Sequence, residues 1–521
     1  MSKKIIITNF VVLKSKYGSA GVAKIKSALK AVIAADAVRG FETSVVDVAN
    51  TAAMRKVGAK KVSSASSPKQ NKNAVDAIYR ASAPEYLVLL GGPDVVPHID
   101  LLNPVYGADD PDRFAPGDLP YCCEAPYSQA VQEFIGPTRV VGRVPDVAGA
   151  NDPAYLLGLL DVAAKWQSRS ASDYQRHLGI SAAVWKGSTT LSLKRIFGPT
   201  VSVKLAPPKG PHWTDADLSA LSHFINCHGA EIDPHYYGQK GNSYPVSHEA
   251  AWVDGKIKEG TIASVECCYG AQLYDPASLA DQQIGIGNIY LANRAYSFFG
   301  STTIAYGPAD GNGSADLLCQ YFLQRVLAGA SLGRAALEAR QQFAQGAASL
   351  DPVDLKTLAQ MNILGDPSIH PVAKTAPSVV VSAKAMRGMA QDTANVAAAR
   401  TDRRRQLFTR GFSIAQTQSV ARFDRKAKPG ADVIKILRQL ATELKLGEAE
   451  ILSYRITSPV MPKAPMVKRA FGVAEMLSRP SHYHVVMGKH AESPMKIPQI
   501  TAVVAKEEDG KIVSYRRLIS R

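Results

Sequence analysis

The first part of the chain alternates short apolar runs with longer amphipathic stretches. Residues 5–13, 84–92 and 138–147 are rich in Val, Ile and Leu, which favours strands. Residues 21–36 and 152–168 instead repeat apolar side chains at the three- and four-residue spacing of a helix. Strands separated by amphipathic helices are typical of βαβ units. The pattern therefore predicts an α/β fold with a mainly parallel sheet flanked by helices.

Two later apolar runs end abruptly in reactive side chains. The run SALSHFINCHGA at 219–230 contains His228 near its end, and the run TIASVECCYGAQ at 261–272 contains Cys268. In an open parallel sheet, chemistry collects where the carboxyl ends of the strands meet solvent. The two residues are 40 positions apart, which leaves room for one loop and one crossover helix. We therefore expect neighbouring strands that bring the imidazole and a thiol together.

A cysteine beside a histidine is the minimal nucleophilic pair, because a protonated imidazole lowers the thiol pKa and later protonates the leaving amine. Neighbouring strand residues face opposite sides, so only one of Cys267 and Cys268 can point towards His228. Attack on a carbonyl also requires preorganised donors for the oxyanion. The backbone N–H groups of Gly229 and Cys268 are the candidates. We predict no metal and no other cofactor, because the Cys and His spacing does not match a tetrahedral site.

The chain resembles the gingipain family of cysteine peptidases, within the wider clan of caspases, legumain and separase. The agreement covers roughly residues 84–372 and runs in the family's order through EYLVLLGGPDVVP, DLPY, VVGRVPD, INCHGA, SVECCYG, FFGSTTIAYG, ADLLCQYF, SLGRAALEARQQF and NILGDPS. The resemblance implies a caspase-like sheet and hydrolysis of peptide bonds through a thioester acyl-enzyme. It assigns Cys268 as the nucleophile and His228 as its partner.

The substrate pocket is where the sequence departs from that family. Gingipains carry an acidic residue that helps to orient the histidine and another that binds a basic side chain at the cleavage position. The matching loop here, WKGSTT at 185–190, holds no carboxylate, so the resemblance does not extend to Arg or Lys specificity. Tyr306 and Asp310 follow the next strand and are candidate pocket residues. Tyr306 is equally compatible with a place in the core.

Composition narrows the setting of the protein. With 521 residues, of which 46% are hydrophobic and 20% charged, the chain is long enough for more than one domain with a sizeable core. No apolar run approaches the roughly 18 residues of a membrane span. Six cysteines, two pairs of them adjacent, do not form a disulfide framework, which favours a reducing, cytoplasmic setting. The family's secretion signal is also missing, which favours an intracellular, regulatory role.

Charge divides the chain into two parts. Residues 377–521 hold 26 Lys and Arg against 12 Asp and Glu, a net charge of +14 out of +16. The break predicts a peptidase domain over 1–376, in two α/β halves divided near residue 150, and a basic α+β accessory domain over 377–521. In the second part, residues 432–447 form an amphipathic pattern and Asp509-Gly510 predicts a hairpin turn. Clustered basic residues suit an anionic partner, either nucleic acid or an acidic protein, although a solubilising surface gives the same composition.

We therefore predict an intracellular cysteine endopeptidase that acts on proteins or peptides. The alternative is a non-catalytic caspase-like scaffold that binds a partner through a sheet edge or through the basic C-terminal part. The presence of both His228 and Cys268 favours the enzyme.

Overall fold

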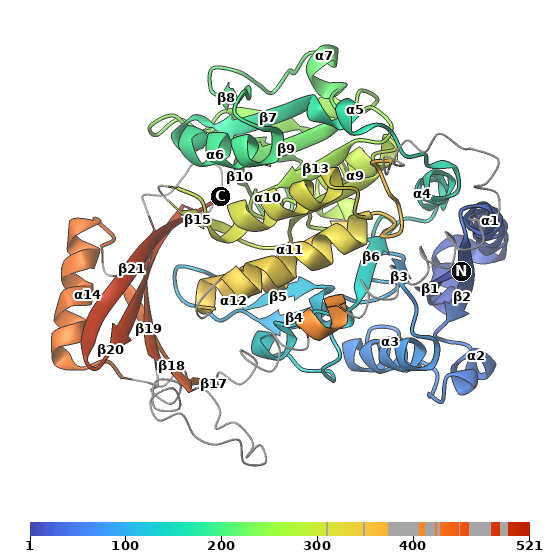
Figure 1. Ribbon diagram of the computed structural model, residues 1–521, viewed down its shortest axis with the longest axis horizontal. Coiled ribbons are helices and arrows are strands. Elements are labelled where there is room, and N and C mark those ends of the chain that lie inside the picture. Colours follow the sequence, from blue (N-terminus) through green and yellow to red (C-terminus); the bar gives the residue numbers. More distant parts are fainter. Residues whose placement is uncertain are drawn as a thin grey trace, which may run out of the picture.

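A ten-stranded sheet forms the centre of the molecule (Figure 1). The computed structural model describes residues 1–308, 311–346, 350–373, 406–411, 422–424, 428–447, 449–457, 481–489, 497 and 499–521. From edge to edge the strands are β2 (Phe41–Asp47), β1 (Ser2–Thr8), β3 (Tyr86–Leu90), β6 (Val140–Val144), β16 (Met361–Leu364), β14 (Ser297–Ser301), β13 (Ile262–Val265), β9 (Ser222–Asn226), β7 (His177–Ala182) and β8 (Lys204–Ala206). Every neighbouring pair in this sheet is parallel except β14 with β16.

Helices flank this sheet, as Figure 1 shows. They are α1 (Phe10–Val38), α2 (Thr51–Lys56), α3 (Pro68–Ser82), α4 (Ala154–Lys165), α5 (Ala171–Gln175), α6 (Lys186–Phe197), α7 (Asp215–Leu218), α8 (Ala250–Val253), α9 (Ile286–Ala292), α10 (Ser314–Leu327), α11 (Leu332–Gly346) and α12 (Pro352–Gln360). The predicted α/β class, a mainly parallel sheet flanked by helices with a smaller α+β C-terminal part, is confirmed. Among the described residues, no helix combines the length and apolarity needed to cross a bilayer.

The first predicted strand ends earlier than its apolar pattern suggests. Residues 10–13 belong to α1, because the side chain of Asn9 accepts hydrogen bonds from the N–H groups of Val11 and Val12 and so caps the helix. The helix is interrupted at Gly18, where φ is +66°. A polar cap therefore overrides the β-branched run that continues past residue 9.

Strands from before and after residue 150, where the sequence predicted a division into halves, belong to the same sheet. Strand β6 comes from the first half, and β14 comes from the second. Strand β16, from residues 361–364, lies between them. It is parallel to β6 and pairs antiparallel with β14 over four positions, so a late segment of the chain closes one continuous sheet.

A second, antiparallel sheet is built mostly from the C-terminal part. Its order is β15 (Tyr306–Pro308), β21 (Lys511–Ser520), β20 (Ile500–Glu508), β19 (Ser481–Lys489), β18 (Glu450–Thr457) and β17 (Arg422–Asp424), and α14 (Ala431–Glu443) packs against it. The predicted helix and the predicted Asp509-Gly510 hairpin are both present, and both turn residues have positive φ. Shorter strands are β4 (Ile99–Leu102) and β5 (Phe114–Gly117), which pair, and β10 (His228–Gly229), β11 (His235–Tyr237) and β12 (Val246–Glu249), which form a third sheet.

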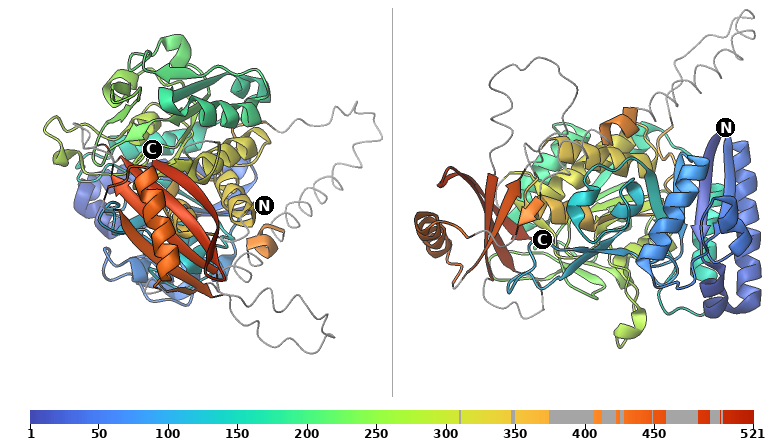
Figure 2. Two further views of the ribbon diagram at one scale, coloured as in Figure 1. Left: turned by 90° about the vertical axis from the view of Figure 1, so that its left-hand side faces the viewer. Right: turned by 90° about the horizontal axis from the view of Figure 1, so that it is seen from below.

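The C-terminal sheet is joined to the rest of the molecule by a shared strand and a shared core. Its edge strand β15 lies well before the boundary expected at residue 376, and it pairs with β21. One hydrophobic cluster also combines Cys268 and Ile304 with Tyr454, Val485 and other residues of the C-terminal sheet. Figure 2 shows this sheet lying against the main body, with α14 on its outer side. The change in charge near residue 376 therefore separates parts of the sequence that fold against each other.

Candidate active site

The two motif strands are neighbours in the central sheet. Strand β9 pairs in parallel with β13, with Ile225 opposite Val265, so both strands end at the same edge. His228 lies two residues beyond the end of β9, and Cys268 lies three residues beyond the end of β13. The expected pairing of these strands is confirmed. Gly229 packs so closely on the other segment that a Cβ there would lie 1.9 Å from the Cys268 carbonyl oxygen.

The two adjacent cysteines face different layers of the molecule. Cys267 belongs to the main core between sheet and helices, and Cys268 belongs to the cluster shared with the C-terminal sheet. Both are fully buried. The Cys268 Sγ accepts a hydrogen bond of 3.3 Å from the backbone N–H of Ala305, and burial raises the pKa of the thiol to about 12.

His228 is held by an amide and not by a carboxylate. Its Nε2 lies 2.8 Å from Oε1 of Gln239, whose amide nitrogen donates to Tyr244 Oη at 2.7 Å and so fixes the orientation of the amide. Because Oε1 only accepts, Nε2 carries the hydrogen and Nδ1 carries the lone pair. Nδ1 is buried and has no hydrogen-bond partner among the described residues. Burial lowers the His228 pKa to about 4, so the imidazole is neutral at pH 7.

The main chain of Arg521, the last residue of the sequence, lies directly on these groups. Its carbonyl oxygen accepts hydrogen bonds from the N–H of Cys268 at 2.9 Å and the N–H of Gly229 at 3.4 Å. The Arg521 N–H donates to the Ala305 carbonyl at 2.9 Å. The C-terminus marked in Figure 1 accordingly lies beside β15. The two N–H groups named from the sequence as oxyanion donors thus converge on a single carbonyl oxygen.

The Arg521 side chain is fully buried in a pocket formed by Asp316, Trp185 and Gly307. Its Nη2 lies 3.1 Å from both carboxylate oxygens of Asp316 and donates to the Pro308 carbonyl at 3.1 Å. The guanidinium carbon lies 4.4 Å from the centre of the Trp185 ring, a cation–π contact. A Cβ at Gly307 would lie 2.2 Å from two guanidinium nitrogens, so the glycine leaves the space that the side chain occupies. Trp185 also packs on the His228 ring, at 4.4 Å between centroids.

A second buried carboxyl group lies behind Asp316. Burial, and then the charge of Asp316, raise the pKa of Glu266 well above its usual range. The raised pKa favours the protonated form of the Glu266 carboxyl group. Asn226, at the end of β9, also approaches Asp316, with 3.5 Å from its amide nitrogen to Oδ1.

The structure describes one of the two pocket residues expected from the sequence. The Tyr306 side chain is fully buried, and its hydroxyl donates to Asp110 at 2.9 Å, while only its backbone pairs with Ser520. Asp310 lies outside the described residues. The carboxylate that the structure places in the pocket is Asp316, in the first turn of α10. Sequence reasoning did not find it, although it lies in the segment ADLLCQYF that supports the family resemblance.

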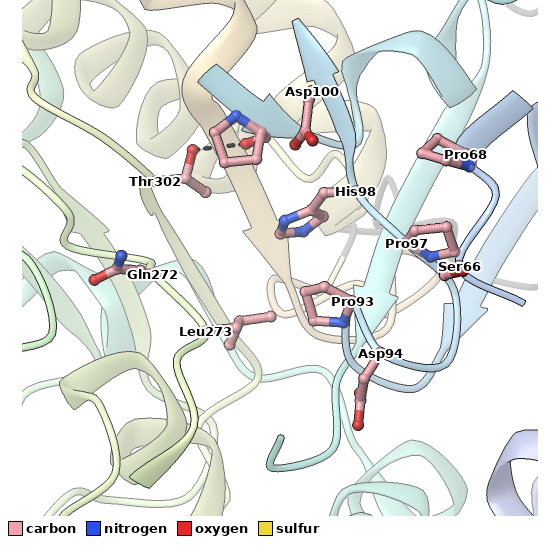
Figure 3. A pocket seen from close by; sticks show the side chains of 11 residues that line it. Ser66, Pro68, Pro93, Asp94, Pro97, His98, Asp100, Gln272, Leu273 and Thr302 are labelled. Atoms are coloured by element: carbon pink, nitrogen blue, oxygen red, sulfur yellow. Dashed lines mark hydrogen bonds between the residues drawn. The ribbon is translucent and has the colours of Figure 1, made fainter. Parts of the chain in front are cut away.

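Figure 3 shows a hollow of about 400 Å³ whose lining includes Gln272 and Leu273, from the segment that follows Cys268. It is lined by Ser66, Pro68, Pro93, Asp94, Pro97, His98, Asp100, Pro116, Gln272, Leu273 and Thr302. Burial lowers the pKa of His98 to about 4, and its Nε2 lies 3.8 Å from Asp118. The hydrogen bonds, ion pair and cation–π contact described for Arg521 involve none of these lining residues. The hollow is therefore distinct from the arginine pocket.

No protein-family model matches the chain, and no curated protein matches it in sequence. The solved structures that match include one described as "Structure of Protease", which is 12% identical and covers 100% of this chain and 97% of its own, at a TM-score of 0.47. At this level of similarity, no conclusion about the chemistry of the site follows.

Proposed function

We propose that the protein is a cysteine endopeptidase that cleaves peptide bonds after arginine. The observation that carries the proposal is the position of Arg521. Its carbonyl oxygen is held by the N–H groups of Cys268 and Gly229 while its guanidinium pairs with Asp316. An arginyl acyl group seated in this way presents its carbonyl carbon to the Cys268 thiol and its charge to the pocket.

The residues of the site supply each step of acyl transfer. His228 Nδ1, the nitrogen with the lone pair, accepts the proton of the Cys268 thiol. The thiolate attacks the carbonyl carbon, and the negative charge that develops on the oxygen is stabilised by the N–H groups of Cys268 and Gly229. The imidazolium then gives its proton to the departing amine, which leaves an arginyl thioester. Water adds to the thioester with His228 as general base, releasing the acid and restoring the thiol.

Asp316 and Trp185 support a preference for arginine. A planar guanidinium stacks on an indole and pairs with a carboxylate, whereas the compact ammonium group of lysine makes the ion pair without the stacking. A neutral side chain would leave Asp316 buried without a counter-charge, which costs several kcal/mol. We expect arginine to be preferred over lysine, and both over neutral residues.

The edge of β15 supports recognition of an extended peptide. Its backbone pairs with Leu518, Ile519 and Ser520 of β21 in antiparallel register, directly before Arg521. A substrate that adds to the same edge would gain main-chain hydrogen bonds that do not depend on its sequence. We expect specificity to come mainly from the arginine, with weaker preferences upstream.

The scaffold alternative is favoured by one observation, the complete burial of Cys268. A thiol whose pKa is raised to about 12 is not a nucleophile as it stands. The scaffold hypothesis predicts that the thiol stays unreactive in every variant. The peptidase hypothesis predicts that it becomes reactive once Arg521 leaves.

The cytoplasmic and regulatory setting and the anionic partner remain proposals. All six cysteines are buried and unpaired, which supports a reducing environment. Part of the basic charge of the C-terminal part is used internally, because Arg516 pairs with Asp351 and Asp354 while Arg521 pairs with Asp316. Any anionic partner must therefore bind the basic residues that remain exposed, such as Lys511 and Arg517.

A library of peptides that differ only in the residue before a fluorogenic amine tests the function. The enzyme is the Arg521→Ala chain, in which the pocket is vacated. We expect release of the fluorophore from arginyl peptides and weaker release from lysyl peptides, both lost on adding Cys268→Ala. Absence of hydrolysis for every member of the library would contradict the proposal.

A further inference from the structure

We propose that the C-terminal strand, residues 518–521, is a tethered inhibitor that occupies the substrate cleft of its own chain. This inference rests on the proposed peptidase function and goes beyond it, because it concerns what keeps the site closed. It predicts a latent enzyme that becomes active when Arg521 is displaced.

The strand occupies every group that a substrate would need. The oxyanion donors are engaged by the Arg521 carbonyl, the pocket carboxylate Asp316 by its guanidinium, and the β15 edge by the three residues before it. Neither Arg521 nor Cys268 has any exposed surface. A peptide cannot reach the thiol until these contacts open together.

The direction of the strand matches that of a substrate. It runs antiparallel to β15 and places the Arg521 carbonyl oxygen, and not another polar atom, between the N–H groups of Cys268 and Gly229. A strand that merely completed the C-terminal sheet would need neither a carbonyl at this point nor a buried arginine. The guanidinium Nε and Nη1 are buried without hydrogen-bond partners in the described part of the chain, so its burial is incompletely compensated.

Residues 518–521 can stay in the site because the rest of β21 is anchored in the C-terminal sheet. Strand β21 pairs with β20 from Thr501 opposite Ile519 to Glu508 opposite Lys511, and the Ile500 N–H donates to the Ser520 hydroxyl at 2.9 Å. Arg516 on β21 also pairs with Asp354 at 2.7 Å. Because the strand is anchored beside the cleft, its last residues are present at a high effective concentration. Inhibition of this kind is intramolecular and does not depend on protein concentration.

Two measurements on the full chain and an Arg521→Ala variant test the inference. The first is the rate at which iodoacetamide alkylates Cys268, followed by mass spectrometry, which needs no catalysis. The second is kcat/KM for an arginyl peptide. We expect both to rise in Arg521→Ala by about 10- to 100-fold, the factor that loss of one charge-assisted hydrogen bond produces. Arg517→Ala removes an equal charge from an exposed position of the same strand and should leave both values unchanged.

Addition of the peptide SYRRLISR, which reproduces residues 514–521, should restore inhibition of Arg521→Ala competitively with substrate. If Arg521→Ala does not fold, Arg521→Lys weakens the same contacts with less disturbance and should give a smaller rise in both values.

Equal alkylation and equal turnover in the full chain and the variant would overturn the inference while leaving the peptidase function standing. Faster alkylation of Cys268 without turnover of the peptide would show that the strand shields the thiol, and it would contradict the peptidase function. Relief of inhibition on simple dilution would overturn the tether, because the occupying strand would then come from a second copy.

Discussion

Arg521 and Asp316 form a fully buried ion pair, with Nη2 of the arginine 3.1 Å from both carboxylate oxygens of the aspartate. The two residues are 205 positions apart: Asp316 lies in the first turn of α10, and Arg521 directly follows β21. Their pairing places an arginine carbonyl over the N–H of Cys268. The ion pair therefore connects the C-terminal sheet to Cys268, which follows β13.

Replacing Cys268 by Ala should abolish hydrolysis, whereas Cys267→Ala should retain most of it. The two side chains enter different clusters, and only Cys268 lies beside the backbone of Arg521. The measurement is kcat/KM for an arginyl peptide in the Arg521→Ala background. Activity lost only in Cys267→Ala would reverse the assignment.

His228→Ala should lower kcat by about 10²- to 10⁴-fold, the usual contribution of a general acid–base group, with an unchanged circular dichroism spectrum. Gln239→Leu should have a smaller effect, because Gln239 positions the ring by holding Nε2–H and touches no substrate. Its effect should fall on kcat and on the pH profile with little change in KM. Equal kcat in the Arg521→Ala chain with and without His228→Ala would remove the histidine from the mechanism.

Asp316→Asn should lower kcat/KM for arginyl peptides by at least about 100-fold and reduce discrimination against neutral residues. The substitution keeps the shape of the side chain and removes the charge that pairs with the guanidinium. The comparison is between arginyl, lysyl and leucyl peptides in the Arg521→Ala background. An unchanged preference for arginine would place the specificity carboxylate elsewhere.

Gly229→Ala should inactivate the enzyme, because the new Cβ would lie 1.9 Å from the Cys268 carbonyl oxygen and would push the two segments apart. Gly187→Ala is the matched control, since a Cβ there meets no atom within 4 Å. Activity and melting temperature should both be retained in the control. Full activity of Gly229→Ala would show that the approach of the two segments is not needed for chemistry.

The buried cluster around Tyr290 predicts a loss of stability in acid. Its hydroxyl bonds both His223 and His248, each at 2.9 Å, and burial lowers the pKa of His248 from 6.5 to about 3. Below pH 6.5 the unfolded chain therefore binds a proton at His248 that the folded chain does not, so the free energy of unfolding falls as the pH falls from 6.5 towards 3.

His248→Gln removes that proton uptake and should reduce the dependence of unfolding free energy on pH by about 1.4 kcal/mol per unit between pH 5.5 and 4. Urea unfolding at several pH values provides the measurement, and the exposed His212, replaced by Gln, is the matched control. Identical slopes for wild type and His248→Gln would mean that the folded protein already protonates His248 in this range.

Local pattern was enough to predict the sheet class and the ends of the two motif strands. His228 and Cys268 could be found because each follows directly on an apolar run. Local pattern did not predict the end of the first strand. The apolar run continues past residue 9, but the side chain of Asn9 caps a helix there. An amide, that of Gln239, holds the histidine, and this residue lies on a loop that no motif of the sequence marks.

Asp316 and Arg521 were beyond sequence reasoning for a different reason. Neither residue lies in a motif that marks it, and they meet only because β21 pairs with β15 across more than 200 positions. The charge break near residue 376 predicted an accessory domain over 377–521, but it gave no sign that β21 of this segment would pair with β15, which begins at Tyr306. Contacts at such sequence separations depend on tertiary packing and not on local pattern.

The most direct test of the peptidase account is covalent labelling with an arginyl acyloxymethyl ketone, which alkylates a cysteine nucleophile only after the arginine has entered the pocket. The Arg521→Ala chain should gain the mass of a single probe, located by peptide mapping on Cys268, and neither Cys268→Ala nor Asp316→Asn should label at the same rate in that background. A chain that gains no probe, or that gains it on any of the other five cysteines, would contradict the account.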